Sequence, residues 1–164
     1  MSSVKELEEK VKELMKEIEK LKQEKKNEEF EYPFERMEQY CCIANNGDII
    51  HGVWTKQEVD TKRYEQGNIF KTKQEAIREI DKRALLTRFR QFRDKCNGDW
   101  KPEWLNKQER KYFMGYLSES KSYEATSCSK GDLFILFGYF KNQDDCKRAI
   151  ELFGDEIIRL WVEE

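Results

Sequence analysis

The sequence has little of what membrane proteins and most enzymes depend on. No apolar run approaches the roughly 20 residues that cross a bilayer, and the first residues lack the apolar core of a signal peptide. The single histidine is His51, so a nucleophile with a histidine base would have to use this residue. No glycine pattern typical of nucleotide-hydrolysing or dinucleotide-binding enzymes occurs. We therefore expect a non-enzymatic, cytoplasmic protein that does not associate with a membrane.

Metal ligation also lacks its usual sequence pattern. There are five cysteines, an odd number, and no Cys-x-x-Cys motif. The gaps from Cys42 to Cys96, Cys128 and Cys146 do not have the spacing of zinc-ligand pairs. We expect reduced thiols, no metal site and no cofactor.

Strong charge of one sign is absent as well. The formal net charge is −2, which argues against binding of nucleic acid through overall charge. A local basic patch remains compatible with this balance.

The first residues form a heptad pattern without a miss. Alternating a and d positions are held by Val4, Leu7, Val11, Leu14, Ile18 and Leu21. A seam this narrow is typical of a coiled coil, and valine and isoleucine at a with leucine at d favour a parallel dimer. Glu17 and Lys22 can pair between chains in that register. We predict a coiled-coil oligomerisation arm over residues 1–29 and an α+β domain over residues 30–164, with a trimer or a tetramer of paired domains as the second choice.

Strand-forming residues and turns alternate with helical patterns in the domain. Strands are predicted at 40–44, 49–54, 111–117 and 133–140, helices at 73–95 and 143–153, and a last short helix or turn at 155–162. Asn46-Gly47 predicts a type I′ hairpin turn, and Gly154 predicts a helix end. Residues 56–67 read as irregular and residues 118–130 as a serine-rich loop. The pattern predicts a small antiparallel sheet with helices packed on one face.

Two segments resemble each other, Ile69–Ile77 and Tyr139–Lys147. Each has an apolar strand end, Phe-Lys, a capping residue and acids in the first helical turn. Thr72 with Glu75 predicts a capping box, and Asn142 precedes two aspartates in the same way. The likeness fits either two independent solutions to one turn or a structural duplication.

Longer motifs resemble a group of small accessory proteins of phages and prophages of Gram-positive bacteria. The matching residues are Phe30 to Phe34, Trp54, Arg63 to Ala76, Tyr139 to Ile150 and Gly154 to Ile157. The resemblance implies a viral accessory protein with an N-terminal coiled coil and carries over no catalytic residue. The tail from Leu160 to Glu164 departs from the group's usual ending.

The helix predicted at 73–95 has one basic side. Its apolar side gathers Ile77, Ile80, Ala84, Leu85, Phe89 and Phe92, and its basic side gathers Lys82, Arg83, Arg90 and Arg93. Arginine presents a donor fork that fits phosphate, although a solvated face would look the same. Arg88 falls on the apolar side near Asp81, where it either pairs with Asp81 or lines a pocket.

Tryptophans near these cations complete the candidate site. We expect phosphate contacts from Arg83, Arg88 and Arg90, with Arg63 as a further cation, and ring stacking from Trp54, Trp100 and Trp104. These side chains would have to converge on one concavity. Otherwise the tryptophans serve to cover the core beneath loops.

Two functions of different classes follow. In the first, an oligomer sequesters a small anionic, nucleotide-type immune signal of the host bacterium. In the second, the protein binds a host or phage protein, or DNA, and changes its activity, with salt-sensitive binding expected for DNA.

Overall fold

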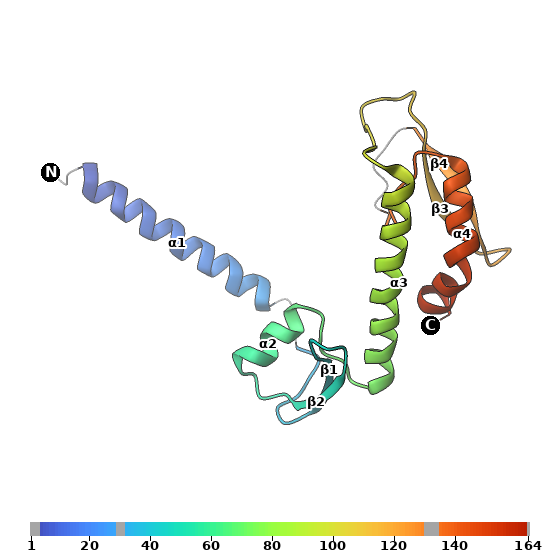
Figure 1. The fold of residues 1–164 in the computed structure, drawn as a ribbon. Helices are drawn as coiled ribbons and strands as arrows, with labels where there is room; N and C mark the ends of the chain where they lie inside the picture. Colours follow the sequence, from blue (N-terminus) through green and yellow to red (C-terminus); the bar gives the residue numbers. More distant parts are fainter. Residues whose placement is uncertain (1–3, 29–31, 130–134, 164) are drawn as a thin grey trace.

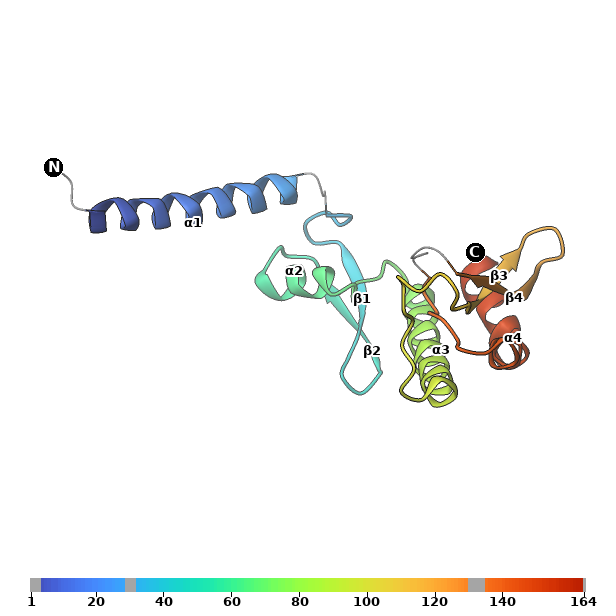
Figure 2. The ribbon, with the colours of Figure 1, turned by 90° about the horizontal axis from the view of Figure 1, so that it is seen from above.

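The computed structural model describes residues 4–28, 32–129 and 135–163, and it confirms an α+β fold (Figure 1). The elements in chain order are α1 (Val4–Glu28), β1 (Gln39–Ile43), β2 (Ile49–Val53), α2 (Glu58–Glu65), α3 (Lys73–Asn97), β3 (Lys111–Leu117), β4 (Ser122–Cys128), α4 (Gln143–Ile157) and the π-helix η1 (Ile158–Val162). The strands form two separate two-stranded antiparallel sheets, β1–β2 and β3–β4, instead of the single sheet expected from the sequence. The two sheets lie near opposite ends of α3 (Figure 1), and seen from above they lie on either side of it (Figure 2).

The first hairpin occurs where it was predicted, but its turn type was wrong. Only Gly47 in the turn has a positive φ, of 88°. Ala44 N–H donates to the Asp48 carbonyl over 2.8 Å, and Gly47 N–H donates to the Ala44 carbonyl over 2.9 Å. A type I′ turn needs positive φ at both central residues, whereas this pattern is that of a three-residue turn closed by a glycine bulge.

Each hairpin is extended by one phenylalanine that bridges its first strand. Phe70 exchanges two backbone hydrogen bonds with Cys41, of 2.8 and 2.9 Å, and Phe140 does so with Tyr112, at 3.0 and 2.7 Å. A helix begins three residues after each bridge. The likeness of the two segments therefore includes the preceding hairpins, which favours a structural duplication.

The second hairpin corrects two expectations. Residues 122–128 are strand β4, paired with β3 along its whole length, and not part of a loop. Of the strand expected at 133–140, residues 133 and 134 lie outside the described part, and from 135 onward only Phe140 pairs. Cross-strand pairing, such as the Tyr116–Tyr123 ring contact at 5.2 Å, outweighs the weak strand propensity of serine in β4.

Capping fixes the start of α3. Thr72 Oγ1 accepts from Glu75 N–H over 3.1 Å, and the Glu75 carboxylate accepts from Lys71 N–H over 2.9 Å. Asn142 holds the equivalent position before α4, but its amide donates to the Asp145 carboxylate over 3.2 Å and does not cap the backbone. Helices α3 and α4 thus both begin three residues after a bridging phenylalanine, but different side-chain contacts accompany the two starts.

Helix α2 and the end of α4 also differ from the predictions. Residues 58–65, expected to be irregular, form α2, whose buried Asp60 binds the first hairpin. Gly154 does not end α4; it lies within the helix and is buried beside Ile150 and Tyr123. The helix continues to Ile157, so the short final helix or turn expected at 155–162 is the end of α4 followed by η1.

Two hydrophobic clusters form the core. The first contains Phe34, Tyr40, Cys42 and Trp54 beside the β1–β2 hairpin. The second lies between α3, β3–β4 and α4, and its buried members are Leu85, Phe89, Met114, Phe137, Phe140, Cys146, Ala149, Phe153, Ile157 and Leu160. Within the described ranges, no helix is both long and apolar enough to cross a membrane.

Helix α1 extends away from the rest of the chain (Figures 1 and 2). Its six seam residues are between 50% and 72% exposed. The helix agrees with the expected arm, whereas the oligomer and the division at residues 29 and 30, which lie outside the described part, stay predictions.

Candidate functional site

Two of the predicted ligand-binding residues lie at the first hydrophobic cluster: Trp54 is a member of it, and Arg63 binds its Tyr40. Trp54 is completely buried, and its Nε1 has no hydrogen-bond partner among the described residues. Arg63 Nη1 donates to the Tyr40 hydroxyl over 2.8 Å. Trp54 cannot stack on a ligand while it is buried, so the tryptophan serves to fill the core there.

A polar network that the sequence did not reveal lies beside this cluster. The Asp60 carboxylate accepts from the Tyr40 hydroxyl over 2.9 Å and from Thr55 N–H and Oγ1–H over 2.8 and 2.7 Å. Burial raises the pKa of Asp60, but the hydrogen bonds from Thr55 and Tyr40 together outweigh it and hold the pKa below its usual value. The network ties α2 to the hairpin.

The cations of α3 do not form one phosphate-binding face. Arg83 pairs with Glu79 over 2.7 Å and donates to the Gly67 carbonyl over 3.3 Å. Arg90 is exposed and has no hydrogen bond or ion pair within the described part of the chain. Arg90 is therefore the predicted cation that remains available on the helix surface.

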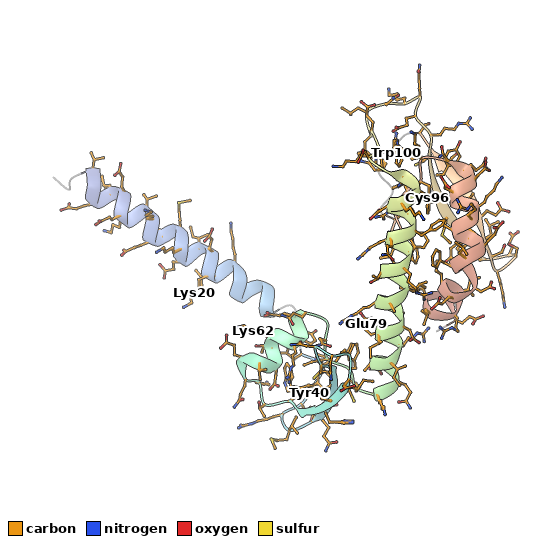
Figure 3. The ribbon with its side chains drawn as sticks, in the orientation of Figure 1. Lys20, Tyr40, Lys62, Glu79, Cys96 and Trp100 are labelled. Atoms are coloured by element: carbon orange, nitrogen blue, oxygen red, sulfur yellow. The ribbon has the colours of Figure 1, made fainter. Side chains whose placement is uncertain are left out.

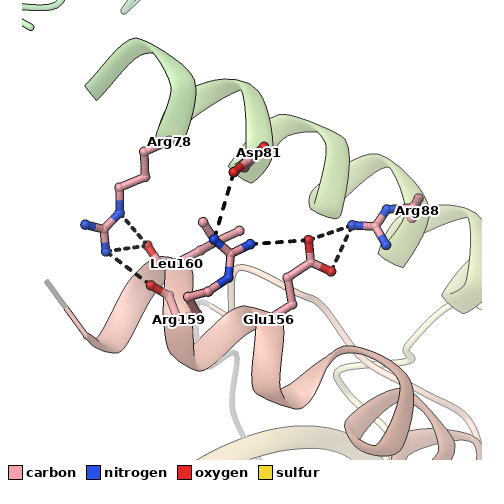
Figure 4. Close-up of polar contacts among 6 residues, drawn as sticks. All are labelled: Arg78, Asp81, Arg88, Glu156, Arg159 and Leu160. Carbon is pink, nitrogen blue, oxygen red and sulfur yellow. Dashed lines mark hydrogen bonds and ion pairs between the residues drawn. The ribbon is translucent and has the colours of Figure 1, made fainter. Parts of the chain in front are cut away.

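Arg88 takes part in an ion network between α3 and the end of the chain (Figure 4). Its Nη2 donates to both Glu156 oxygens over 2.8 and 2.9 Å, whereas Asp81 lies 4.0 Å from Arg159. Arg78 donates to the Leu160 carbonyl from Nε and Nη2, over 3.2 and 3.1 Å. These contacts attach α4 and η1 to α3, so Arg88 pairs with a carboxylate as the sequence allowed, but with Glu156 instead of Asp81.

Trp100 and Trp104 follow α3 in a loop held by one carboxylate. Glu109 accepts from Trp100 Nε1–H over 2.8 Å and from Glu103 N–H over 2.8 Å. The Lys111 ammonium, almost completely buried, lies 3.2 Å from the Glu109 carboxylate and 5.7 Å from the centre of the Trp104 ring. The pKa of Glu109 is lowered by its hydrogen-bond donors. The N–H of Glu103 has the largest effect, followed by the indole of Trp100 and the ammonium of Lys111.

A recess of about 400 Å³ lies where this loop meets the end of α3. Its described lining comprises Arg93, Asp94, Asn97, Gly98, Trp100, Lys101, Pro102, Gly138 and Tyr139. Trp100 is the member of the predicted site that lines it. Trp104 is not part of the described lining, although its ring lies edge-on to that of Tyr139 at 5.1 Å.

Backbone geometry shapes the recess. Gly98, with φ of 55°, ends α3, and Asn97 donates to the Tyr139 carbonyl over 2.8 Å. Arg93 Nη1 donates to the Phe137 carbonyl over 3.1 Å. Gly138 has a φ of 72°, which favours glycine, and a Cβ there would lie 2.5 Å from that nitrogen, so a larger residue would displace the Arg93 guanidinium.

The predicted convergence on one concavity is not found among the described residues. Trp54 packs beside Tyr40, and Figure 3 shows Tyr40 and Trp100 at opposite ends of α3. The recess instead combines the Trp100 ring with Arg93, which the sequence analysis placed on the basic side of the helix but not among the ligand contacts, and with Lys101, which it did not name. Lys101 directly follows Trp100, and this adjacency is the sequence signal that could have revealed it.

His51 and the cysteines show no grouping typical of a catalytic or metal site within the described residues. His51 Nδ1 lies 3.6 Å from Cys41 Sγ across the first hairpin. In the described ranges, no three metal-ligating side chains are grouped as a metal site requires.

Comparison with known proteins adds no relative. No protein-family model matches the chain, and neither a curated protein nor a solved structure is detectably similar to it.

Proposed function

We propose that this protein is a non-enzymatic, homo-oligomeric binding protein that holds an anionic, nucleotide-type ligand in the recess at the end of α3. In the phage context that the sequence resemblance implies, it would act in the host cytoplasm and sequester an immune signal. The observation that carries the proposal is the recess itself, where Trp100 adjoins the cations Lys101 and Arg93.

The composition of the lining matches such a ligand. An aromatic ring offers a surface for a base to stack on, and Lys101 offers an exposed ammonium for a phosphate. Arg93 already donates to Phe137 and to Asp94, at 3.1 and 2.7 Å, so its charge is balanced by Asp94 and Lys101 is the main phosphate-binding cation of the described lining. The volume of about 400 Å³ suits a small molecule.

The exposed seam of α1 supports self-association. Six apolar side chains in heptad register are uncovered in the single chain, and a second copy would bury them. Oligomerisation multiplies binding sites per particle, which serves a protein that works by stoichiometric capture.

The test is a thermal-shift and calorimetric screen against cyclic dinucleotides, cyclic trinucleotides and ADP-ribose derivatives, because a ligand raises thermal stability by mass action. Lys101→Glu should weaken binding about 10- to 100-fold through loss of one charge-assisted contact. Lys107→Glu is the matched control, since Lys107 is exposed in the same loop outside the recess lining.

The Arg90→Glu variant distinguishes binding in the recess from binding on the basic face of α3. If Arg90→Glu abolishes binding and Lys101→Glu does not, the ligand binds on the helix face and the recess is not the site. If no compound binds but DNA is retained in a salt-sensitive manner, nucleotide capture is wrong and DNA binding replaces it.

A further inference from the structure

We propose that the outer edge of β4 and the adjoining flank of α4 form a docking surface for a second copy of this chain, related by a two-fold axis. The surface lies on β4 and α4 and uses neither the arm nor the recess. It therefore stands independently of the proposed function.

The outer edge of β4 has unpaired backbone groups. Tyr112 directs both its N–H and its C=O to Phe140, away from β4. Antiparallel strands alternate these directions, so Ser127 opposite Tyr112, and likewise Ala125 and Tyr123, direct their backbone groups outward. No described residue hydrogen-bonds to these outward groups. An open edge of this kind is a template for another strand.

The strand has few of the devices that block an edge. Over its seven residues, Ser122–Cys128, β4 contains no lysine and no proline, its register with β3 has no bulge, and Glu124 is its one charged residue. Natural proteins protect free edges with such features. With a single charge as its protection, this edge can accept a further strand.

A groove runs beside this edge. It has a volume of about 410 Å³, and its described lining comprises Tyr123, Glu124 and Ala125 from β4 and Gln143, Lys147, Ile150 and Glu151 from α4. Helix α3 contacts a different flank of α4, where Glu156 pairs with Arg88. Gln143, Lys147 and Glu151 are exposed, so no described part of the single chain covers this flank of α4.

The charges of this flank are self-complementary, and they identify the occupant as a second copy. About a two-fold axis, each α4 runs antiparallel to its copy, so Lys147 approaches Glu151 of the second copy at two symmetric places. Lys147 has only a 3.8 Å contact with Asp144 in its own helix and remains largely exposed. In the strand pairing centred on Ala125, Glu124 faces Thr126 of the second copy, so no like charges oppose each other.

The test uses the full chain with Leu14→Lys and Ile18→Lys, which place charge in the seam of α1 so that arm assembly cannot mask the second contact. Sedimentation analysis should still find a concentration-dependent dimer. Within this background, Lys147→Glu and Glu151→Lys should each weaken dimerisation by about tenfold. Lys141→Glu, the same charge change outside the groove lining, should have no effect.

Mixing the two single variants is the decisive step. It restores opposite charges at both contacts between chains but leaves the i to i+4 pair within each helix like-charged. Recovered dimerisation, with slowed amide hydrogen exchange at Tyr123, Ala125 and Ser127, supports the proposal.

A monomer at every concentration, or a mixture that does not recover, overturns it. Protection of these amides only when an unrelated extended peptide is added to a monomeric chain also overturns it. These measurements need neither ligand nor arm, so failure of the proposed function would not affect them.

Discussion

Glu109→Gln is the substitution whose effect the structure defines most sharply. The carboxylate of Glu109 accepts from Trp100, Glu103 and the Lys111 ammonium, at 2.8, 2.8 and 3.2 Å. Glutamine keeps the shape and removes the charge, which leaves Lys111, 1% exposed at its side chain, as a buried cation beside carbonyl oxygens. Breaking a buried pair in this way costs up to about 3–5 kcal/mol.

The partial exposure of Glu109, 24% at its side chain, reduces that figure. We expect a loss of about 2–3 kcal/mol in the free energy of unfolding, measured by urea denaturation at pH 7. The melting temperature should fall by roughly 4–12 °C for a chain of this size. Lys111→Met should cost less, about 1 kcal/mol, because Glu109 keeps two N–H donors and partial access to water.

The pH dependence tests the same reasoning. The pKa of Glu109 is lowered from 4.5 on folding, so its contribution to stability is complete above 4.5 and is lost as pH falls through the folded-state value. The difference between wild type and Glu109→Gln should shrink over that range. A difference below about 0.5 kcal/mol at pH 7, within the scatter of ordinary surface substitutions, would refute the argument, and so would a difference that does not change with pH.

Three further predictions concern the arm, a helix cap and the buried network. The double variant Leu14→Lys, Ile18→Lys should lower the particle mass in light scattering, because it abolishes arm assembly. Lys16→Glu, outside the seam, should leave the mass unchanged. An unchanged mass in the double variant would exclude a coiled coil. Thr72→Ala should cost about 1 kcal/mol and lower the melting temperature by roughly 2–4 °C, because Glu75 N–H loses its cap. Asp60→Asn should lower the free energy of unfolding by about 1.5–3 kcal/mol. Because the pKa of Asp60 is lowered on folding, that loss should diminish as pH falls below 3.8. A stability equal to wild type at pH 7 would show that the network contributes nothing.

The sequence by itself determined the features that depend on residues near one another in the chain. The heptads of α1, the Thr72 cap and the glycine after Asn97 each act within one helix, so spacing predicts them. The Asn-Gly hairpin was located for the same reason, although its turn type depends on backbone angles that residue types only bias.

Tertiary structure decided what depends on pairing between distant residues. Strand β4 is polar and serine-containing, and it is a strand because β3 pairs with it. Helix α2 is short and weakly amphipathic, and the contact of Asp60 with Tyr40, twenty residues earlier, helps to hold it. Its helical state could not be predicted from local propensity alone.

The candidate site shows the same division. The sequence predicted that cations and tryptophans form one ligand-binding site. Three-dimensional packing instead distributes them among a hydrophobic core, an ion network and a loop. Whether a tryptophan fills the core or lines a recess is decided by which distant surfaces meet around it. Trp54 and Trp100 have the same side chain and opposite surroundings for that reason.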